Sequence, residues 1–360
     1  MFPRILTEYT RSNEAVHFSA FDKDGGVFSG EATTDQGFWD SYRTVYAQLS
    51  IAYPEQCARL IGAWVNAWKE GGCAALLPAR PPARPPDSPS KVALPCVREP
   101  KRICYNAEFA RHQRAGSCTH HRWLPKWASP GYRGGMVGTM GDTVLSDAIV
   151  KRVDRFGRTN QSFAVAEAYA AVRQDAFVVP PPFNASDPLS MRWGRYGLES
   201  YLKHGYVPFD VNMTTGPASE TVSRTMNYAL SDFSISQAAA ALGHADDAAV
   251  LLNRSYGYRQ LFDKQTGFFR SKAANGSFHA EFDQFAWGND YTEAGPWQYR
   301  FYAPHDVQGW PLCACMASSR SCPRVELQSR LPGSRRYLAV SAGSNLNRPG
   351  TPLTRVLDVS

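Results

Sequence analysis

Apolar residues recur at helical spacing along most of this chain. Seven segments place an apolar residue every three or four positions, the pattern of a helix that buries one face. In the clearest, 220–242, one stripe runs from Val222 to Ala241, and Gly243 marks the end of the helix. A second segment, 245–262, follows at once, so the two predict an antiparallel helical hairpin. The remaining segments are 40–52, 60–70, 142–154, 163–175 and 193–204.

Strand patterns are few. Signals for strands are confined to 15–30 and to a short stretch at 267–270. The chain is therefore predicted to be mainly α-helical and built from helical hairpins. Its 360 residues, of which 43% are apolar and 20% charged, are enough to enclose a sizeable core.

Two segments differ from the rest of the chain. Residues 74–90 are rich in proline, which prevents regular helix, and 91–122 show no clear periodicity. Residues 73–122 carry nine basic and three acidic residues, the tail 310–360 carries seven and two, and the remainder carries 23 and 27. Seven of the eight cysteines also lie in these two segments, whereas a secreted disulfide framework would distribute them through the core. Both segments therefore look foreign to the folded body.

The net charge of +7 comes entirely from these two segments. It is thus no sign of a nucleic-acid partner for the body, and the tail lacks the interleaved aromatic residues of a recognisable nucleic-acid module. The proline-rich piece also fits an SH3-like groove. Potential metal ligands lie after it, at a spacing that matches no standard zinc pattern: Cys104, Cys118, His120 and His121. No run of about 18 apolar residues occurs, so we expect no membrane span.

Loops between the predicted helices hold groups that suit a sugar. Trp39, Asp40 and Arg43 lie at a helix start, and Arg133 ends a loop rich in proline and glycine. Segment 290–299 packs two carboxylates, a tryptophan, a glutamine and two tyrosines into ten residues. Aromatic faces stack on the C–H face of a pyranose, while carboxylates bind its hydroxyls and supply acid and base for glycoside cleavage. Each residue also fits an ordinary role, such as helix N-cap for Asp40 or core for the tryptophans, and the clustering in loops is what favours a sugar site.

Six longer motifs occur in order along the chain. They are WDSYRT (39–44), WLPKWASPGYRGGMVG (123–138), VSRTMNYA (222–229), LFDKQTGF (261–268), YTEAGPWQY (291–299) and PHDVQG (304–309). Together they resemble the motifs of glycoside hydrolase family 92, the calcium-dependent exo-acting α-mannosidases. The resemblance covers 1–72 and 123–309.

The resemblance implies a fold. Family 92 enzymes join an N-terminal β-sandwich to an (α/α)6 barrel, so we expect a mainly α chain, an incomplete (α/α)6 barrel preceded by remnants of the β-sandwich and its linker. Residues 1–39 would be the linker and last strands, and 40–72 with 123–309 the partial barrel. We interpret 73–122 as a retained intron and 310–360 as an aberrant, disordered tail, because charge, cysteine content and periodicity change sharply at their edges.

The resemblance also implies roles for individual residues. It places the general acid at Glu293. The reaction would invert configuration, and its base would lie in a Gly-Asn-Asp/Glu-Asp-x-Gly-Gln segment that this sequence does not contain. Calcium is the implied cofactor, with Gln298 as a candidate ligand. Asn227 stands where the family motif usually has glutamate. The terminal mannose would be bound by Trp39, Asp40, Arg43, Arg133 and Trp297.

We therefore interpret the chain as part of an exo-α-mannosidase that removes terminal α-linked mannose, such as α-1,2-linked mannose, from glycans. Without the base segment, the chain alone is expected to be inactive. Two other classes stay open. A non-catalytic carbohydrate-binding remnant would bind mannose without hydrolysis, and a nucleic-acid adaptor would act through the basic tail.

The expected partner is thus a mannose-containing glycan, with no nucleic acid and no membrane. Residues 1–10 carry charge and no apolar segment, so they are not a signal peptide. Five Asn-x-Ser/Thr sequons are compatible with a secretory route, and localisation is left open. They begin at Asn160, Asn184, Asn212, Asn253 and Asn275.

Overall fold

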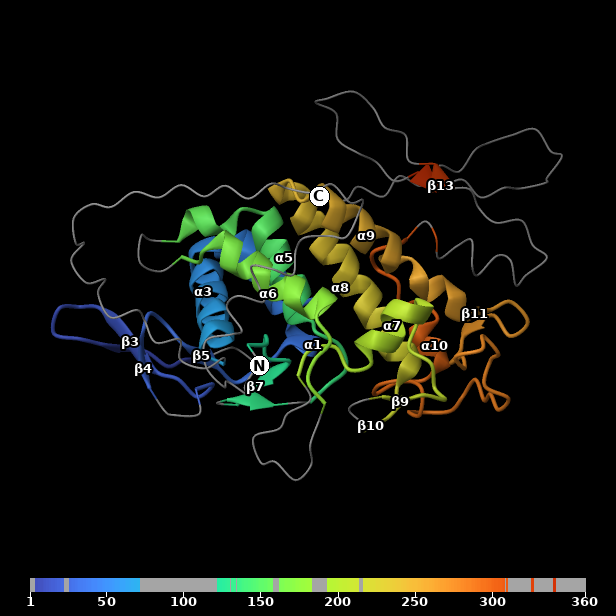
Figure 1. Cartoon of the computed structure of the whole chain (residues 1–360). Helices are drawn as coiled ribbons and strands as arrows, with labels where there is room; N and C mark the ends of the chain where they lie inside the picture. Colours follow the sequence, from blue (N-terminus) through green and yellow to red (C-terminus); the bar gives the residue numbers. More distant parts are fainter. Residues whose placement is uncertain are drawn as a thin grey trace, which may run out of the picture.

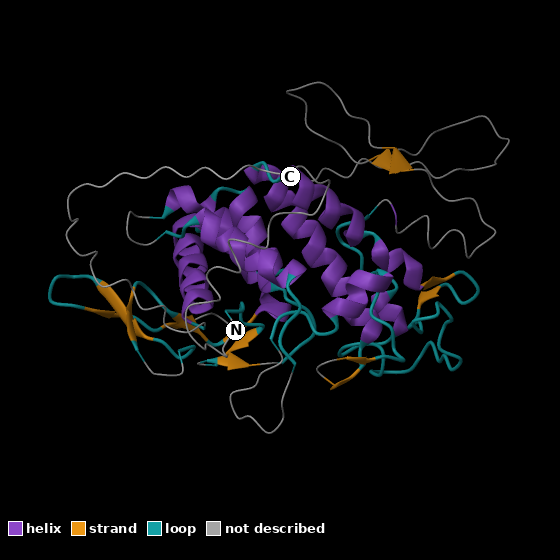
Figure 2. Cartoon of the chain, viewed as in Figure 1, coloured by secondary structure: helices purple, strands orange, loops and turns teal. Residues whose placement is uncertain are grey.

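Helices form the centre of the molecule in the computed structural model, and short strands lie along its edge (Figures 1 and 2). The structure describes residues 4–22, 26–71, 122–129, 131–133, 135–157, 162–182, 193–213, 216–307 and 309, with two short strands in the tail. The helices are α1 (Phe38–Ser41), α2 (Val45–Ala52), α3 (Pro54–Glu70), α5 (Gly141–Val150), α6 (Val165–Phe177), α7 (Leu198–His204), α8 (Thr221–Leu242), α9 (Ala245–Ser255), α10 (Pro296–Tyr299) and the 3-10 helices η1 (Val153–Phe156) and η2 (Gly257–Leu261).

The strands form small antiparallel sheets. β1 (Arg4–Ile5) pairs with β5 (Thr33–Thr34), and β3 (Ala15–Phe18) lies between β2 (Glu8–Tyr9) and β4 (Val27–Ser29). β7 (Trp127–Ala128) lies between β6 (Gln36–Gly37) and β8 (Tyr132–Arg133). The remaining pairs are β9 (Asn212–Met213) with β10 (Gly216–Pro217), β11 (Phe262–Asp263) with β12 (Phe268–Phe269), and β13 (Val325–Glu326) with β14 (Ala339–Val340). The described part is mainly α-helical, as the sequence predicts.

Most predicted helices are present, with shifted ends. α3 begins six residues before the predicted start because Pro54 suits the first helical position. The predicted helix 193–204 begins only at Leu198, since Gly194 and Gly197 have a left-handed backbone. The segment 40–52 is divided into α1 and α2.

Helix α8 is the centre of the helical core. It packs against α5, α6, α9 and η2, and α9 follows through a short link at Gly243, which confirms the predicted hairpin. The single apolar stripe expected for α8 is wrong. Its first half, from Thr221 to Asp232, is buried on every side, while Ala241 at its end is exposed. A helix surrounded by other helices needs no polar face.

One hydrophobic core joins residues from both sides of the 72–121 segment, which lies outside the described residues. Leu49 and Trp64 from α2 and α3 belong to the same buried cluster as Leu145 of α5 and Val172 of α6. The predicted potential metal ligands in 104–121, like most of the tail, also lie outside the described residues.

The chain leaves this core and re-enters it at one place. Gln174 of α6 accepts a hydrogen bond from the Trp68 indole (3.3 Å) and donates one to the backbone carbonyl of Arg122. The Arg122 guanidinium lies 5.9 Å from the Trp68 ring centre. Because Trp68 is in the last turn of α3, Gln174 holds together the two points between which 72–121 are inserted.

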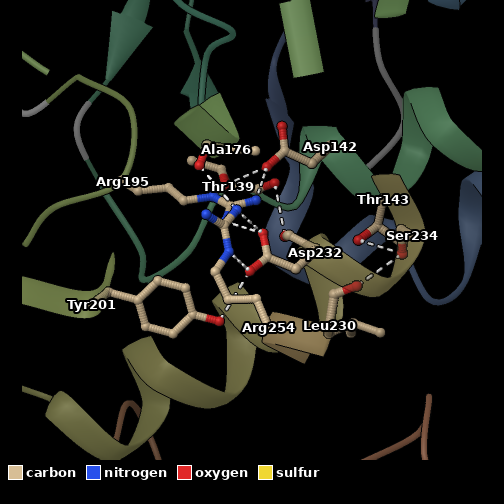
Figure 3. A network of polar contacts seen from close by, with 11 residues as sticks. Thr139, Asp142, Thr143, Ala176, Arg195, Tyr201, Leu230, Asp232, Ser234 and Arg254 are labelled. Carbon is tan, nitrogen blue, oxygen red and sulfur yellow. Dashed lines mark hydrogen bonds and ion pairs between the residues drawn. The ribbon is translucent and has the colours of Figure 1, made fainter. Parts of the chain in front are cut away.

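Buried charges fix the helices relative to one another (Figure 3). Arg195, which lies before α7, is fully buried and reaches Asp142 of α5 (3.1 Å) and Asp232 of α8. Asp232 also binds Arg254 of α9 (2.5 Å) and the Tyr201 hydroxyl (3.0 Å). Burial raises the pKa of Asp232, but the two guanidinium groups outweigh this effect and leave its pKa lowered. This network therefore connects α5, α7, α8 and α9 through buried charges, each of which is compensated by a partner of opposite charge.

Candidate functional site

A three-stranded sheet brings the first two groups of candidate residues together. In β6, β7 and β8, Gly37 is opposite Trp127 and Trp127 is opposite Arg133. Gly37 is followed by α1, which carries Trp39 and Asp40. Adjacent strands lie about 4.8 Å apart, so Arg133 is roughly 10 Å from the start of α1. Its side chain is exposed and donates two hydrogen bonds to the Ser129 carbonyl (2.8 and 3.1 Å).

An aromatic cluster surrounds Arg43. Its guanidinium lies 5.1 Å from the Trp39 ring centre, 4.6 Å from that of Tyr42 and 5.8 Å from that of Tyr302. The Tyr42 and Tyr302 hydroxyls share a hydrogen bond of 2.8 Å. Trp39 is half-buried, and Asp40 and Arg43 are exposed. The cluster links α1 to the segment that follows α10.

Tyr302 continues this contact to the loop of the candidate acid. Its ring lies 5.5 Å from that of Tyr299, whose hydroxyl donates to the Thr292 carbonyl (3.4 Å). Thr292 directly precedes Glu293. The structure therefore brings the Trp39 to Arg43 group beside the Glu293 loop, and α1 and α10 lie along the same side of the molecule (Figure 1).

The loop of Glu293 is bound to the start of α8. The backbone N–H of Glu220 donates to the Asn289 carbonyl (3.1 Å), and those of Val222 and Ser223 donate to the Asp290 carbonyl (3.2 and 3.3 Å). The first N–H groups of a helix have no partner within the helix, and α8 has no side-chain cap. The loop supplies these acceptors itself, so its position is fixed by the longest helix of the described part.

Glu293 has a left-handed backbone, with φ of 49°. Its neighbours hold it there: the Thr292 N–H donates to the Ser223 hydroxyl (2.8 Å), and the Gly288 N–H donates to the Ala294 carbonyl (2.9 Å). A left-handed conformation costs a residue with a side chain about 1–3 kcal/mol and is enriched at functional sites. The Glu293 side chain is exposed, so its carboxylate is accessible.

Two carboxylates near Glu293 are already bound. Glu220 accepts hydrogen bonds from the Thr292 hydroxyl (2.9 Å) and from Arg224 (3.1 Å). Asp290 accepts one from the Ser271 hydroxyl (2.5 Å). Both therefore have structural partners, and Glu293 is the accessible carboxylate of this loop.

The PHDVQG motif also has a structural role. Asp306 is buried and accepts hydrogen bonds from the Tyr258 hydroxyl (2.7 Å), Arg259 (2.9 Å) and the Gly309 N–H (2.9 Å). Burial raises the pKa of Asp306, but these donors outweigh it and leave the pKa lowered. The adjacent His305 donates from Nε2 to the Ser255 carbonyl (3.0 Å).

The predicted ligand Gln298 does not lie in a calcium-like set of oxygens. Its side-chain carbonyl accepts the Gly295 N–H (3.0 Å) and so caps α10. Calcium takes six to eight oxygen ligands. Within the described ranges, no three His, Cys, Asp or Glu side chains gather where a metal ion would fit. Gln298 thus has a structural role in this part of the chain, and calcium stays an expectation from the family resemblance.

Asn227 anchors the loop that follows Arg133. Its side-chain amide donates to the Val137 carbonyl (3.1 Å), and its Cβ lies against Gly138, at 2.9 Å from where a Cβ of that glycine would be. Gly138 is left-handed, with φ of 94°, so the close approach and the backbone both suit glycine. A glutamate at position 227, usual in the family motif, would have no N–H to donate.

Sequence reasoning missed three aromatic residues near the Glu293 loop. Tyr302 carries the contact with α1, and Phe285 and Trp287 are exposed beside the loop. The only signal for them was their density in 282–302, where eight residues are aromatic. A hollow of about 580 Å³, lined by residues such as Tyr53 and Arg59, lies elsewhere on the surface. None of the described helices has the length and hydropathy needed to cross a membrane.

A helical core that displays an accessible carboxylate, tryptophans and arginines on loops is compatible with a glycoside hydrolase domain. A family model described as "Glycosyl hydrolase family 92 catalytic domain" matches residues 108–321. The match spans more than half of the chain, and the chain therefore belongs to glycosyl hydrolase family 92.

Individual relatives agree with this family. An "Uncharacterized secreted glycosidase" from Arthroderma benhamiae is 27% identical over 215 residues, which are 52% of this chain and 26% of that protein. The structure of a family GH92 inverting mannosidase from Bacteroides thetaiotaomicron VPI-5482 is similar with a TM-score of 0.64 and 26% identity, over 87% of this chain and 33% of that one. A family GH92 α-mannosidase from the same species shares the fold, with a TM-score of 0.58, 24% identity and 86% and 31% coverage. The chain thus spans about a quarter to a third of these relatives.

Proposed function

We propose that this chain is the part of an inverting exo-α-mannosidase that binds the terminal mannose and carries the general acid. Its family membership and its similarity to an inverting mannosidase support the reaction class. A related α-mannosidase has been solved with mannoimidazole, which supports mannose as the sugar bound. The proposed partner is a glycan with terminal α-linked mannose.

Glu293 is the proposed general acid. A general acid in glycoside cleavage protonates the oxygen of the bond that breaks, so it must reach a substrate from a fixed position. The exposed side chain and the backbone bonds of its loop to α8 provide both conditions. The single observation that carries the proposal is this left-handed, firmly held carboxylate beside the Arg43 cluster.

The mannose subsite is proposed to lie between Glu293 and α1. Asp40 would accept hydrogen bonds from sugar hydroxyls, and Arg43 and Arg133 would donate them. Trp39 and Trp297 would offer aromatic surface to the ring. Arg43 is already oriented by its three aromatic neighbours, so little side-chain freedom is lost when it binds.

Hydrolysis needs a second carboxylate to activate water from the opposite face of the sugar. In inverting enzymes it lies about 6.5–9.5 Å from the acid. Glu220 and Asp290, the carboxylates bound near Glu293, have structural partners, and the sequence has no segment of the type expected to carry the base. We therefore propose that the 360-residue chain binds mannose without turning it over. A non-catalytic carbohydrate-binding protein is the second candidate. The structural partners of Glu220 and Asp290, which leave neither carboxylate free to act as the base, favour it as well.

We propose that the helices belong to an (α/α)6 barrel. The α8–α9 hairpin and the packing of α5 on α6 support this architecture. Residues 73–122 are proposed to be a retained intron, since Gln174 holds both ends of the gap in one place. Sequencing the mature transcript across codons 70–125 tests this proposal. A transcript that encodes the whole segment would contradict it.

The function is tested by combining a binding and a cleavage assay. Isothermal titration of the intact chain with methyl α-D-mannopyranoside should show binding, and Asp40→Ala should abolish it. Tyr53→Ala, an exposed residue outside the proposed subsite, is the matched control. Release of p-nitrophenol from p-nitrophenyl α-D-mannopyranoside should be undetectable. Absence of binding in the wild-type chain would refute the proposal.

A further inference from the structure

Two exposed aromatic rings lie just before the Glu293 loop. Phe285 and Trp287 are 77% and 69% exposed. Asp283 holds this segment in a turn, because its carboxylate accepts the Phe285 N–H (2.9 Å) and its backbone carbonyl accepts the Ala286 N–H (3.2 Å). Exposure of large apolar rings lowers solubility, and a turn that fixes them in water suggests a ligand.

Trp287 adjoins the proposed acid. The Gly288 N–H donates to the Ala294 carbonyl (2.9 Å). Trp287 and Glu293 each directly precede one partner of this bond, so the bond closes the loop that carries Glu293 and holds Trp287 at its base. Gly295 fits closely there, since a Cβ on it would lie 2.4 Å from the Ala286 carbonyl oxygen.

The faces of the Trp287 ring are open. Trp297, on the other side of the loop, is 41% exposed, with its ring at 4.9 Å from Phe268 and the Arg300 guanidinium at 5.4 Å. Among the described residues, Trp287 has no such ring or cation contact. It is therefore the better placed of the two tryptophans to receive a flat ligand.

We propose that Trp287, with Phe285 beside it, is the platform for the leaving-group sugar, the residue that departs with the glycosidic oxygen. This inference rests on the proposed function. The oxygen that Glu293 protonates joins the terminal mannose to the next sugar, so that next sugar lies beside Glu293. An indole face binds the C–H face of a neutral pyranose. Trp287 thus selects for glycans over small aglycones.

The test compares one sugar with two. The intact chain carrying Glu293→Gln, which removes the proposed general acid and so excludes any residual cleavage, is titrated with methyl α-D-mannopyranoside and with α-1,2-mannobiose. The disaccharide should bind more tightly. Trp287→Ala should weaken disaccharide binding about 3- to 10-fold and leave the monosaccharide unchanged. Trp287→Phe should restore part of the loss, and Tyr53→Ala should change neither affinity.

The outcomes separate this inference from the function on which it rests. If the monosaccharide binds and the disaccharide binds no better, the subsite is refuted and the proposed function stands. An equal loss for both sugars in Trp287→Ala would also refute the subsite. If neither sugar binds, both proposals fail.

Discussion

Replacing Arg195 with methionine removes the charge that two buried carboxylates share. Arg195, Asp142 and Asp232 are each fully buried. Asp232 keeps Arg254 as a partner in the variant, whereas Asp142 keeps no cation among these partners and is left with the Thr139 hydroxyl (2.6 Å) and the neighbouring Asp175 carboxyl. Removal of one partner from a buried ion pair costs about 3–5 kcal/mol. The expected loss of unfolding free energy is therefore a large part of the total.

The size of this loss depends on pH. Without Arg195, Asp142 escapes the cost of an unpaired charge by taking up a proton. Protonating a carboxyl with an ordinary pKa of about 3.9 costs about 4 kcal/mol at pH 7 and about 1.5 kcal/mol at pH 5. Burial already raises the pKa of folded Asp142 against the opposing effect of Arg195, and loss of Arg195 would raise this pKa further, so the variant loses stability as pH increases above the unfolded pKa. The deficit of Arg195→Met should thus shrink by more than half between pH 7 and pH 5.

Urea unfolding followed by tryptophan fluorescence at both pH values measures this deficit. Arg152→Met is the matched control, because Arg152 forms a surface pair with Asp154 (3.3 Å) and is half exposed. Its loss should be at most about 1 kcal/mol at either pH. A deficit for Arg195→Met below about 1 kcal/mol at pH 7, or one that is equal at both pH values, would refute the reasoning.

Four further predictions follow from the same structure. Burial and the neighbouring Asp142 carboxylate raise the pKa of Asp175, so this carboxyl favours the protonated form when the chain is folded and the ionised form when it is unfolded. The melting temperature of Asp175→Asn should therefore match that of the wild type at pH 4 and exceed it at pH 8. A lower melting temperature at pH 8 would contradict this. Burial lowers the pKa of His17, but the hydrogen bond to Glu70 (2.9 Å) outweighs this effect, so the net pKa is raised. The resulting stabilisation is present below about pH 6.5 and is lost as pH rises through the folded pKa. Glu70→Gln should therefore flatten the pH profile of the unfolding free energy, and parallel profiles for variant and wild type would disprove this role. Asn227→Ala should cost about 1–3 kcal/mol in urea unfolding, because a buried carbonyl loses its donor, and a loss under about 0.5 kcal/mol would show that the bond is unimportant. Deletion of 73–121 should leave the helical circular dichroism spectrum unchanged. It should increase the free energy of unfolding by up to about 3 kcal/mol, because a shorter loop loses less entropy on closure. Loss of cooperative unfolding would show that the segment is needed.

Local patterns predicted the helices that make mainly local contacts. The α8–α9 hairpin could be read from apolar spacing and Gly243, because a helix end is encoded within a few residues. The late start of α7 depends on the left-handed backbone at Gly197, which no periodicity reveals. The burial of the whole first half of α8 could not be predicted either, since polar residues there, such as Asp232, have partners from other parts of the chain.

The sequence named candidate site residues, and their arrangement in space could not be predicted from it. Motifs placed Glu293 in a loop and Asp40 at a helix start, but the 2.8 Å bond between Tyr42 and Tyr302 joins residues 260 positions apart. Contacts at such separation depend on the whole fold. The use of Gln298 as a helix cap likewise depends on the turn at α10, and amide side chains suit a cap as well as a metal.

The proposed function depends above all on a mannose site formed by the described loops. Saturation-transfer NMR of the intact chain with methyl α-D-mannopyranoside and with methyl α-D-glucopyranoside tests it most directly, because the two sugars differ only in the orientation of one hydroxyl. We expect saturation transfer to the mannoside alone, and its loss in Arg43→Ala. Equal transfer to both sugars, or to neither, would contradict it.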